Sequence, residues 1–213
     1  MSHRIEAVTL AGPAGPLEAQ CMIPAAGPAA GAALLCHPHP LQGGTMHTKA
    51  LHHAARALVA AGFPVLRFNF RGVGRSAGAH TGGPGERDDA RAALDWLAWR
   101  FPGPTVVGGF SFGSWVGLEV GNADPRVAAL IGIAPPLSLY RFDFLESGTA
   151  PLLAVVGDRD AFCPVPDLEA LGTRLGARAT IRILPGAEHL LTTHLAPLHD
   201  AILGFARAVL HPL

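Results

Sequence analysis

One serine of the chain stands in a pattern that suits a nucleophile. The segment Gly109–Gly113, GFSFG, fits the pattern G-x-S-x-G and places Ser111 at its centre. A sharp turn from a strand into a helix leaves no room for side chains two residues before and after such a serine. Random placement of the residues predicts about 0.09 such matches in the chain. Ser111 is therefore the candidate nucleophile, whereas Ser114 lacks the flanking glycines.

A candidate acid and a candidate base follow Ser111 in the chain. A serine hydroxyl becomes nucleophilic when a histidine accepts its proton, and the histidine needs an acid to fix its tautomer. The order expected with this motif is serine, acid, histidine, each after a strand. The segment GDRDAFCP offers Asp158 and Asp160, and PGAEHLL offers His189. We favour Asp160, because it lies further past its strand, and expect Asp158 to bond to turn backbone.

The segment LLCHPHPLQGG, residues 34–44, could complete the site with a backbone donor. A developing oxyanion needs N–H groups, and we expect one from Phe112 at the start of the helix after the serine. The two prolines of the segment have no N–H. The second donor is therefore His39 or Leu41, with His39 favoured, and His37 is expected to brace the loop.

His37 and His39, together with three later histidines, could instead form a metal centre. The candidate ligands are His37, His39, His47, His52 and His53. The pattern H-x-H-x-D-H requires an Asp and a His where Leu41 and Gln42 stand. The adjacent His52 and His53 on a helix would point about 100° apart. We expect no metal and no other cofactor.

The segments that carry these residues alternate between strands and helices. Apolar or alternating runs predict strands at 5–10, 17–23, 31–37, 63–70, 104–110, 127–136, 150–158 and 179–186. Helical periodicity covers 47–62, 85–100, 113–123, 164–176 and 194–210. This order predicts one α/β domain over residues 1–213: a doubly wound, mostly parallel sheet with an N-terminal antiparallel hairpin and helices on both faces. Ligands of such sheets bind beyond the carboxyl ends of the strands.

Composition excludes several classes of partner. The 213 residues are 49% hydrophobic and 15% charged, with a net charge of zero and three cysteines. Binding to nucleic acid needs clustered positive charge, and a membrane span needs about 18 consecutive apolar residues. Neither pattern is present, and the first residues lack the apolar core of a signal peptide. We expect a cytoplasmic protein with a small-molecule substrate. The sequence does not decide between a monomer and a homodimer.

Several of these motifs resemble the α/β-hydrolase superfamily over residues 5–210. The resemblance lies in RFNFRGVGRSAG (67–78), in the acid loop GDRDAFCP and in the histidine loop GAEHLL. More narrowly, CHPHPLQGGTMHTKA is similar to small bacterial predicted serine hydrolases with a His-Pro-His-Pro turn. The resemblance implies the α/β-hydrolase fold and a Ser111–His189–Asp160 triad. Many relatives have His-Gly where this chain has His37-Pro38.

The segment 137–149, where larger relatives insert a lid, is short, so we expect a minimal lid and an open site. Phe110, Phe142 and Phe144 are the candidate substrate-binding residues. The leading hypothesis is a serine hydrolase that cleaves a carboxylic ester or thioester through an acyl-enzyme. Peptidase, lactonase or perhydrolase chemistry and a non-catalytic binding module stay as alternatives. Cys163 lies outside the serine turn, which disfavours a thiol nucleophile.

Overall fold

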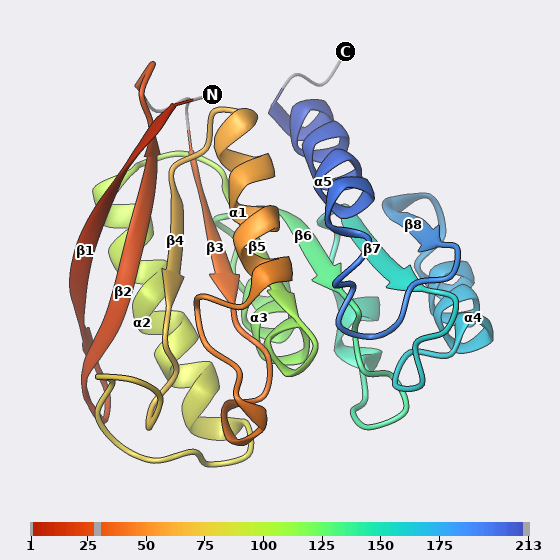
Figure 1. The fold of residues 1–213 in the computed structure, drawn as a ribbon, viewed down its shortest axis with the longest axis horizontal. Coiled ribbons are helices and arrows are strands. Elements are labelled where there is room, and N and C mark those ends of the chain that lie inside the picture. The colour runs from red at the N-terminus through yellow and green to blue at the C-terminus, as the bar shows by residue number, and fades with distance from the viewer. Residues whose placement is uncertain (1, 28–30, 211–213) are drawn as a thin grey trace.

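An eight-stranded sheet in the order β1-β2-β4-β3-β5-β6-β7-β8 forms the centre of the structure (Figure 1). The computed structural model describes residues 2–27 and 31–210; residues 1, 28–30 and 211–213 of the predicted domain lie outside the described residues. The strands are β1 (His3–Gly12), β2 (Gly15–Pro24), β3 (Ala32–Cys36), β4 (Val65–Phe68), β5 (Thr105–Phe110), β6 (Val127–Ile133), β7 (Leu152–Gly157) and β8 (Ala179–Leu184). The β1–β2 hairpin is antiparallel and β2 joins β4 antiparallel, whereas the strands from β4 to β8 are parallel.

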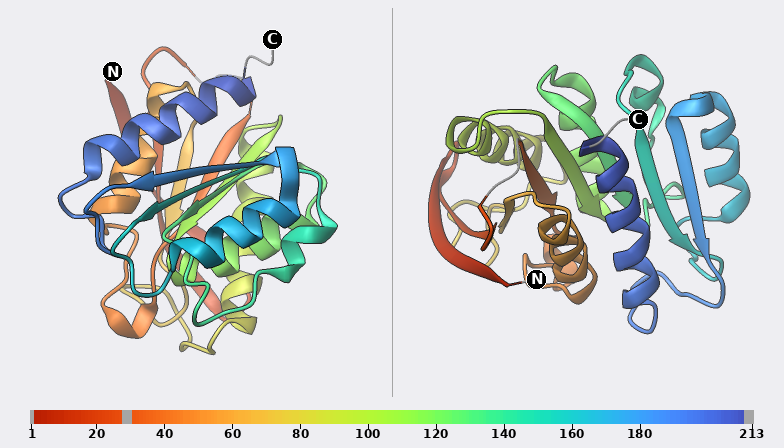
Figure 2. Two further views of the ribbon diagram at one scale, coloured as in Figure 1. Left: turned by 90° about the vertical axis from the view of Figure 1, so that its right-hand side faces the viewer. Right: turned by 90° about the horizontal axis from the view of Figure 1, so that it is seen from above.

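Helices cover both faces of the sheet. In the described residues they are α1 (Lys49–Ala60), α2 (Pro84–Arg100), α3 (Phe112–Ala123), α4 (Val165–Leu175) and α5 (Leu195–Leu210). Helices α1 and α5 pack on one face, and α2, α3 and α4 pack on the other (Figure 2). The 3₁₀ turns are η1 (Pro40–Gln42), η2 (Asp143–Ser147) and η3 (Gly176–Arg178). The predicted fold class is confirmed.

The central strands are buried along their whole length and, apart from Arg67 and Thr105, are apolar, because both faces of the sheet are covered. Every residue of β3, β4, β5 and β7 is buried. Neighbouring side chains point to opposite layers, as the twofold period of a strand requires. Leu34 and Val107 belong to the core beneath α2 and α3, whereas Leu35 and Val106 belong to the core beneath α1 and α5.

The strand order changes direction between β3 and β5. From β3 the chain crosses to β4 on one side, and it later returns to β5 on the other side of β3. Cys36 at the end of β3 pairs with Gly109 near the end of β5. The loops that follow these two strands therefore leave the sheet side by side, at a topological switch point where ligands bind in such folds.

Several predicted elements are longer than the observed ones, and two of these differences have a local cause. The predicted helix 47–62 begins only at Lys49, because Thr48 bonds to the carbonyl of Thr45 in a preceding turn. The predicted strand 127–136 ends at Ile133, because Ala134 adopts a φ of 46° and two prolines follow it. No described helix is long and apolar enough to cross a membrane.

Candidate active site

Ser111 occupies a strained turn between β5 and α3. Its φ of 53° and ψ of −123° lie where residues with a side chain rarely occur. Its N–H donates to the carbonyl of Ile133 at 2.9 Å. A Cβ added to Gly109 would lie 2.6 Å from the amide nitrogen of Ser114, and one added to Gly113 would lie 2.6 Å from the carbonyl carbon of Cys36. The two glycines of the motif therefore allow the turn to close against its neighbours.

Ser111, His189 and Asp160 form a continuous chain of hydrogen bonds. The Nε2 atom of His189 lies 2.9 Å from the Ser111 Oγ, and its Nδ1 lies 2.8 Å from the Asp160 Oδ2. Asp160 is 5% exposed, and its Oδ1 accepts from the N–H groups of Phe162 and Cys163. Because the carboxylate accepts the Nδ1 proton, the Nε2 lone pair faces the serine hydroxyl. This is the arrangement in which a histidine can accept a serine proton.

The competing candidates have structural roles instead. Asp158 accepts the N–H of Gly186 at 2.7 Å and so joins the acid loop to the histidine loop, as expected. The Ser114 hydroxyl donates to the carbonyl of Ser111 at 2.6 Å within the first turn of α3. Burial, and secondarily the charge of Asp160, raise the pKa of the Cys163 thiol to about 12. That thiol is therefore a poor nucleophile near neutral pH.

The backbone N–H groups of His39 and Phe112 are free to bind an oxyanion. Both residues line the same cavity as Ser111, and neither N–H donates to an acceptor within residues 2–27 and 31–210. The N–H of Leu41, the alternative donor, points instead to the Nδ1 of His39 at 3.2 Å. That bond caps the turn η1, which the sequence did not predict. Leu41 is thus removed from the candidate donors.

His37 holds the loop after β3 in place, as expected. Its side chain is fully buried, its Nε2 accepts the N–H of Phe70 at 3.0 Å, and its Nδ1 donates to the carbonyl of Pro38 at 2.6 Å. Burial lowers the pKa of His37 to about 4, so the ring is neutral at pH 7. With both nitrogens bonded, His37 has no free atom to act as a base or a ligand.

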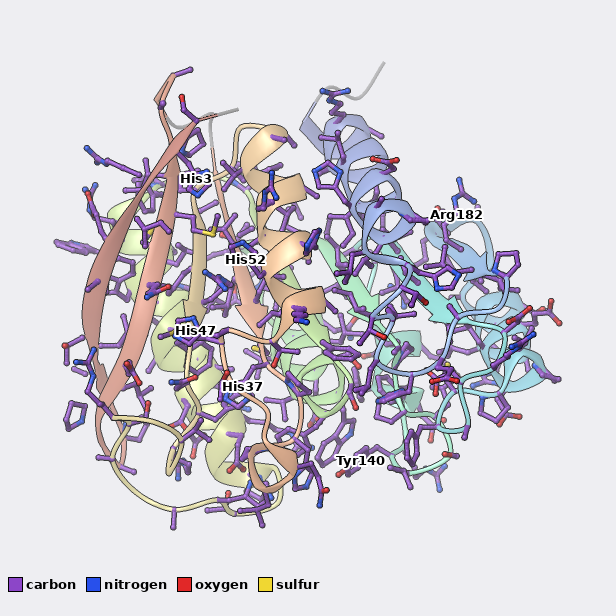
Figure 3. All side chains as sticks on the ribbon, in the orientation of Figure 1. His3, His37, His47, His52, Tyr140 and Arg182 are labelled. Atoms are coloured by element: carbon purple, nitrogen blue, oxygen red, sulfur yellow. The ribbon has the colours of Figure 1, made fainter. Side chains whose placement is uncertain are left out.

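The five histidines considered as metal ligands are spread over the structure. Figure 3 shows His37 beyond the arrowhead of β3 and His52 on the side of α1. In the part of the chain that the structure describes, no three His, Cys, Asp or Glu side chains are grouped closely enough to hold a metal ion.

A cavity of about 540 Å³ lies above Ser111 at the carboxyl end of the sheet. Its described lining contains no Asp, Glu, Lys or Arg and consists of Pro38, His39, Gln42, Gly43, Gly44, Thr48, Phe110, Ser111, Phe112, Leu139, Tyr140, Phe162, His189 and Leu190. Leu139, Phe162 and Leu190 are 59%, 42% and 60% exposed. These three apolar side chains are therefore both exposed and part of the cavity lining.

Two of the three candidate substrate-binding residues lie away from this cavity. Phe110 lines it and packs 5.6 Å from the His189 ring, between ring centres. Phe142 and Phe144 do not line it, and Phe142 is 3% exposed within the core beneath α3. The turn η2 directs them inward, since Asn122 donates to the carbonyl of Phe144 and pins the segment to α3. The assignment of Phe142 and Phe144 is therefore corrected, and Leu139 and Tyr140 of the same segment face the cavity instead.

Two functional-site neighbours were missed by the sequence interpretation. The His80 ring lies 4.8 Å from the His39 ring and 5.5 Å from the Phe112 ring, between centres. Its Nδ1 bonds to the buried carboxyl of Glu86 at 2.9 Å. Burial alone would raise the pKa of Glu86, but hydrogen bonds from Thr81 and Gly83 lower it. Glu86 is the third residue of α2, three residues after the N-cap Gly83. This is a capping signal that marks the helix start but does not reveal the contact with His80.

The fold and the hydrogen-bonded Ser111, His189 and Asp160 define the class of the α/β serine hydrolases. The chain belongs to the X-Pro dipeptidyl-peptidase (S15) family, whose model matches residues 16–158. The match ends before Asp160 and His189, so it does not cover the acid and the base.

Relatives agree with this class. The chain is 37% identical over 188 residues to an uncharacterised protein of Rickettsia prowazekii, covering 84% of this chain and 79% of the relative. An α/β serine hydrolase homologue from Coxiella burnetii is 34% identical with a TM-score of 0.88, over 94% of this chain and 96% of that one. An α/β serine hydrolase without a lid from Xanthomonas campestris is also 34% identical, with a TM-score of 0.87, over 97% and 95%.

Proposed function

We propose that the protein is a serine hydrolase that cleaves the carboxylic ester or thioester bond of a small, uncharged substrate. The observation that carries this proposal is the continuous hydrogen-bonded chain from the Ser111 Oγ through His189 to Asp160, which opens into the cavity at the end of the sheet. Each of the three residues follows the carboxyl end of a parallel strand, where this fold binds its ligands.

The reaction runs in two steps. The Ser111 oxygen attacks the carbonyl carbon while the His189 Nε2 takes the hydroxyl proton, and Asp160 stabilises the imidazolium that forms. The carbonyl oxygen becomes an oxyanion. As the tetrahedral intermediate collapses, His189 gives the proton to the leaving alcohol or thiol, which leaves an acyl group on Ser111. Water then repeats the sequence through His189 and releases the acid.

The oxyanion would be bound by the backbone N–H groups of Phe112 and His39. Both are without a described acceptor and both line the cavity beside Ser111. The Phe112 N–H also lies at the N-terminus of α3, where the helix dipole favours negative charge. Removing one such donor typically lowers turnover by about 10²- to 10³-fold.

Peptidase activity is the second candidate, because the matching family is described as X-Pro dipeptidyl-peptidases. Such a substrate carries an N-terminal ammonium, which needs a carboxylate near the scissile bond when it is taken out of water. The described lining of the cavity contains none, and the carboxylate of Asp160 is bonded to His189 and to two backbone N–H groups. This distribution of charge supports an uncharged ester over a dipeptidyl substrate.

A substrate panel separates these candidates. We expect p-nitrophenyl acetate, butyrate and hexanoate to be hydrolysed by the wild type, and this activity to be lost in Ser111→Ala. We expect Gly-Pro-p-nitroanilide to be cleaved with a much lower kcat/KM than the esters. A higher kcat/KM for the anilide would establish the peptidase instead. No turnover of any substrate, together with tight binding of one, would indicate a binding module.

A further inference from the structure

Tyr140 lies in a stack of flat side chains at one wall of the active-site cavity. Its ring is parallel to the ring of Trp115, with centres 4.2 Å apart and an angle of 15° between the planes. The guanidinium carbon of Arg87 lies 4.3 Å from the centre of the Trp115 ring. Two groups cannot share one face of a ring at these separations, so Arg87 and Tyr140 cover opposite faces of Trp115.

The inner layers of this stack are held firmly. Arg87 forms an ion pair with Glu119, with 2.6 Å between its Nη2 and the Glu119 Oε2. Glu119 lies four residues after Trp115 on α3, so both belong to the same face of the helix. A Cβ added to Gly83 would lie 2.7 Å from the ring of Trp115, which shows that the backbone of Gly83 packs directly on the edge of the ring. Trp115 therefore has little freedom to move away from Tyr140.

The segment that carries Tyr140 is fixed to the other side of the cavity. Ser138 donates both its N–H and its hydroxyl to the carbonyl of Phe162, at 3.1 and 3.0 Å. The N–H of Tyr140 donates to the carbonyl of Pro136 at 3.1 Å. The Phe162 ring in turn packs against the His189 ring, with centres 4.8 Å apart. Tyr140 and Phe162 thus form connected walls beside the reacting residues.

The outer face of Tyr140 is the last layer of the stack. The ring is half-buried and lines the cavity that contains Ser111, and Figure 3 shows it at the carboxyl end of the sheet. Among the described aromatic rings, Phe112 and Trp115 contact it, and Phe112 does so edge-on at 6.0 Å. The face of Tyr140 opposite Trp115 therefore has no aromatic partner among the described residues, and it is the face that a ligand ring would cover.

A second, smaller hollow of about 330 Å³ also borders Tyr140. Its described lining includes four charged side chains, namely Arg141, Asp143, Asp167 and Arg174. The described lining of the Ser111 cavity contains no charged residue of these types and is mostly apolar or aromatic. A flat apolar group bound at Tyr140 is therefore accommodated on the side of Ser111 and not in the charged hollow.

We propose that Tyr140 is a specificity residue that stacks on an aromatic ring in the acyl group of the substrate. The acyl group stays attached to Ser111 in the intermediate, next to Phe112, and the Phe112 ring contacts Tyr140. The leaving group departs on the side of His189, which is flanked by Phe162 and Leu190. This inference rests on the proposed hydrolase function and narrows its substrates to esters of arylalkanoic or related aromatic acids.

The test compares two esters that differ in the flatness of one ring. Methyl phenylacetate and methyl cyclohexylacetate have the same leaving group and similar size, but only the first has a flat ring. A stacked aromatic pair contributes enough beyond its buried area to change kcat/KM by about 2- to 12-fold. We expect the wild type to prefer the phenyl ester within that range, mainly through a lower KM.

Two substitutions of Tyr140 make the test specific. Tyr140→Phe keeps the flat face and should keep the preference, whereas Tyr140→Leu keeps an apolar side chain without a ring and should abolish it. A wild-type enzyme without a preference, or a preference that survives in Tyr140→Leu, would overturn the inference. Labelling of Ser111 by a fluorophosphonate separates this failure from that of the proposed function: an enzyme that is labelled and hydrolyses both esters equally contradicts the role of Tyr140 alone.

Discussion

Gly113→Ala should move the two proposed oxyanion donors, the N–H groups of Phe112 and His39, away from each other. A Cβ at Gly113 would lie 2.6 Å from the carbonyl carbon of Cys36 and closer still to its oxygen. Ordinary contacts begin at 3.4 Å, so the two backbones must move apart by more than about 0.8 Å. The carbonyl of His37 also lies against this position. Both obstacles are backbone, so no side-chain rotation can relieve the overlap.

The movement would shift the turn that carries the His39 N–H away from Ser111 and Phe112. A misplacement of about 1 Å at a catalytic site can lower the rate by about 10²-fold. Overpacking of this kind also typically destabilises a protein by about 1–3 kcal/mol. We therefore expect Gly113→Ala to lose about 10²-fold in kcat/KM for p-nitrophenyl butyrate and to unfold at a lower temperature.

Gly204→Ala is the matched control. Gly204 lies in α5, and a Cβ added there meets no atom within 4 Å. Alanine in a helix is favoured over glycine by about 1 kcal/mol, so this variant should keep its kcat/KM and gain some stability. The reasoning is refuted if Gly113→Ala retains both the kcat/KM and the Tm of the wild type.

Three further predictions follow from the site. His39→Pro deletes the proposed donor N–H and should lower kcat by about 10²- to 10³-fold. His39→Asn keeps an acceptor for the Leu41 N–H and should retain most of the activity. Equal losses of kcat in the two variants would point to the imidazole itself. Because the pKa of His37 is about 4 in the folded state and 6.5 without burial, the unfolded chain takes up the proton first as pH falls. Folding stability should therefore be retained above about pH 6.5 and decrease by about 3 kcal/mol towards pH 4. Urea unfolding should show this loss in the wild type and a smaller loss in His37→Gln, and parallel losses would contradict it. Asp160→Asn should lower kcat by about 10⁴-fold, because the amide favours the wrong tautomer of His189. Asp158→Asn should keep its bond to Gly186 and most of the activity. Similar losses of kcat in both variants would contradict the assignment of Asp160 as the acid.

The sequence predicted the helices, the strands and the turn at Ser111 because local rules determine them. The continuous apolar runs of β3 and β5 are those of strands covered on both faces. The glycines around Ser111 are required by contacts within a few residues and with the adjacent strand. The choice of Asp160 over Asp158 followed from distance along the loop and from the resemblance of GDRDAFCP to the acid loop of α/β-hydrolases. The geometry places Asp160, not Asp158, against His189.

The walls of the cavity could not be predicted in this way because they depend on packing between distant segments. Phe142 and Tyr140 are two residues apart, yet one is buried in the core and the other lines the cavity. The turn η2 and the bond from Asn122 decide between them, and neither has a clear signal in the sequence. The N–H of Leu41 looked free because the His39 side chain that accepts it caps a turn of only three residues.

Covalent labelling by a fluorophosphonate tests the central claim most directly, because the probe reacts with a serine only where a base activates it. Intact-mass and peptide measurements should show one adduct on the wild type, located on Ser111, and none on Ser111→Ala. Ser114→Ala should still be labelled at Ser111, since the Ser114 hydroxyl is bonded to the carbonyl of Ser111. An adduct that persists in Ser111→Ala at the wild-type rate would contradict the account.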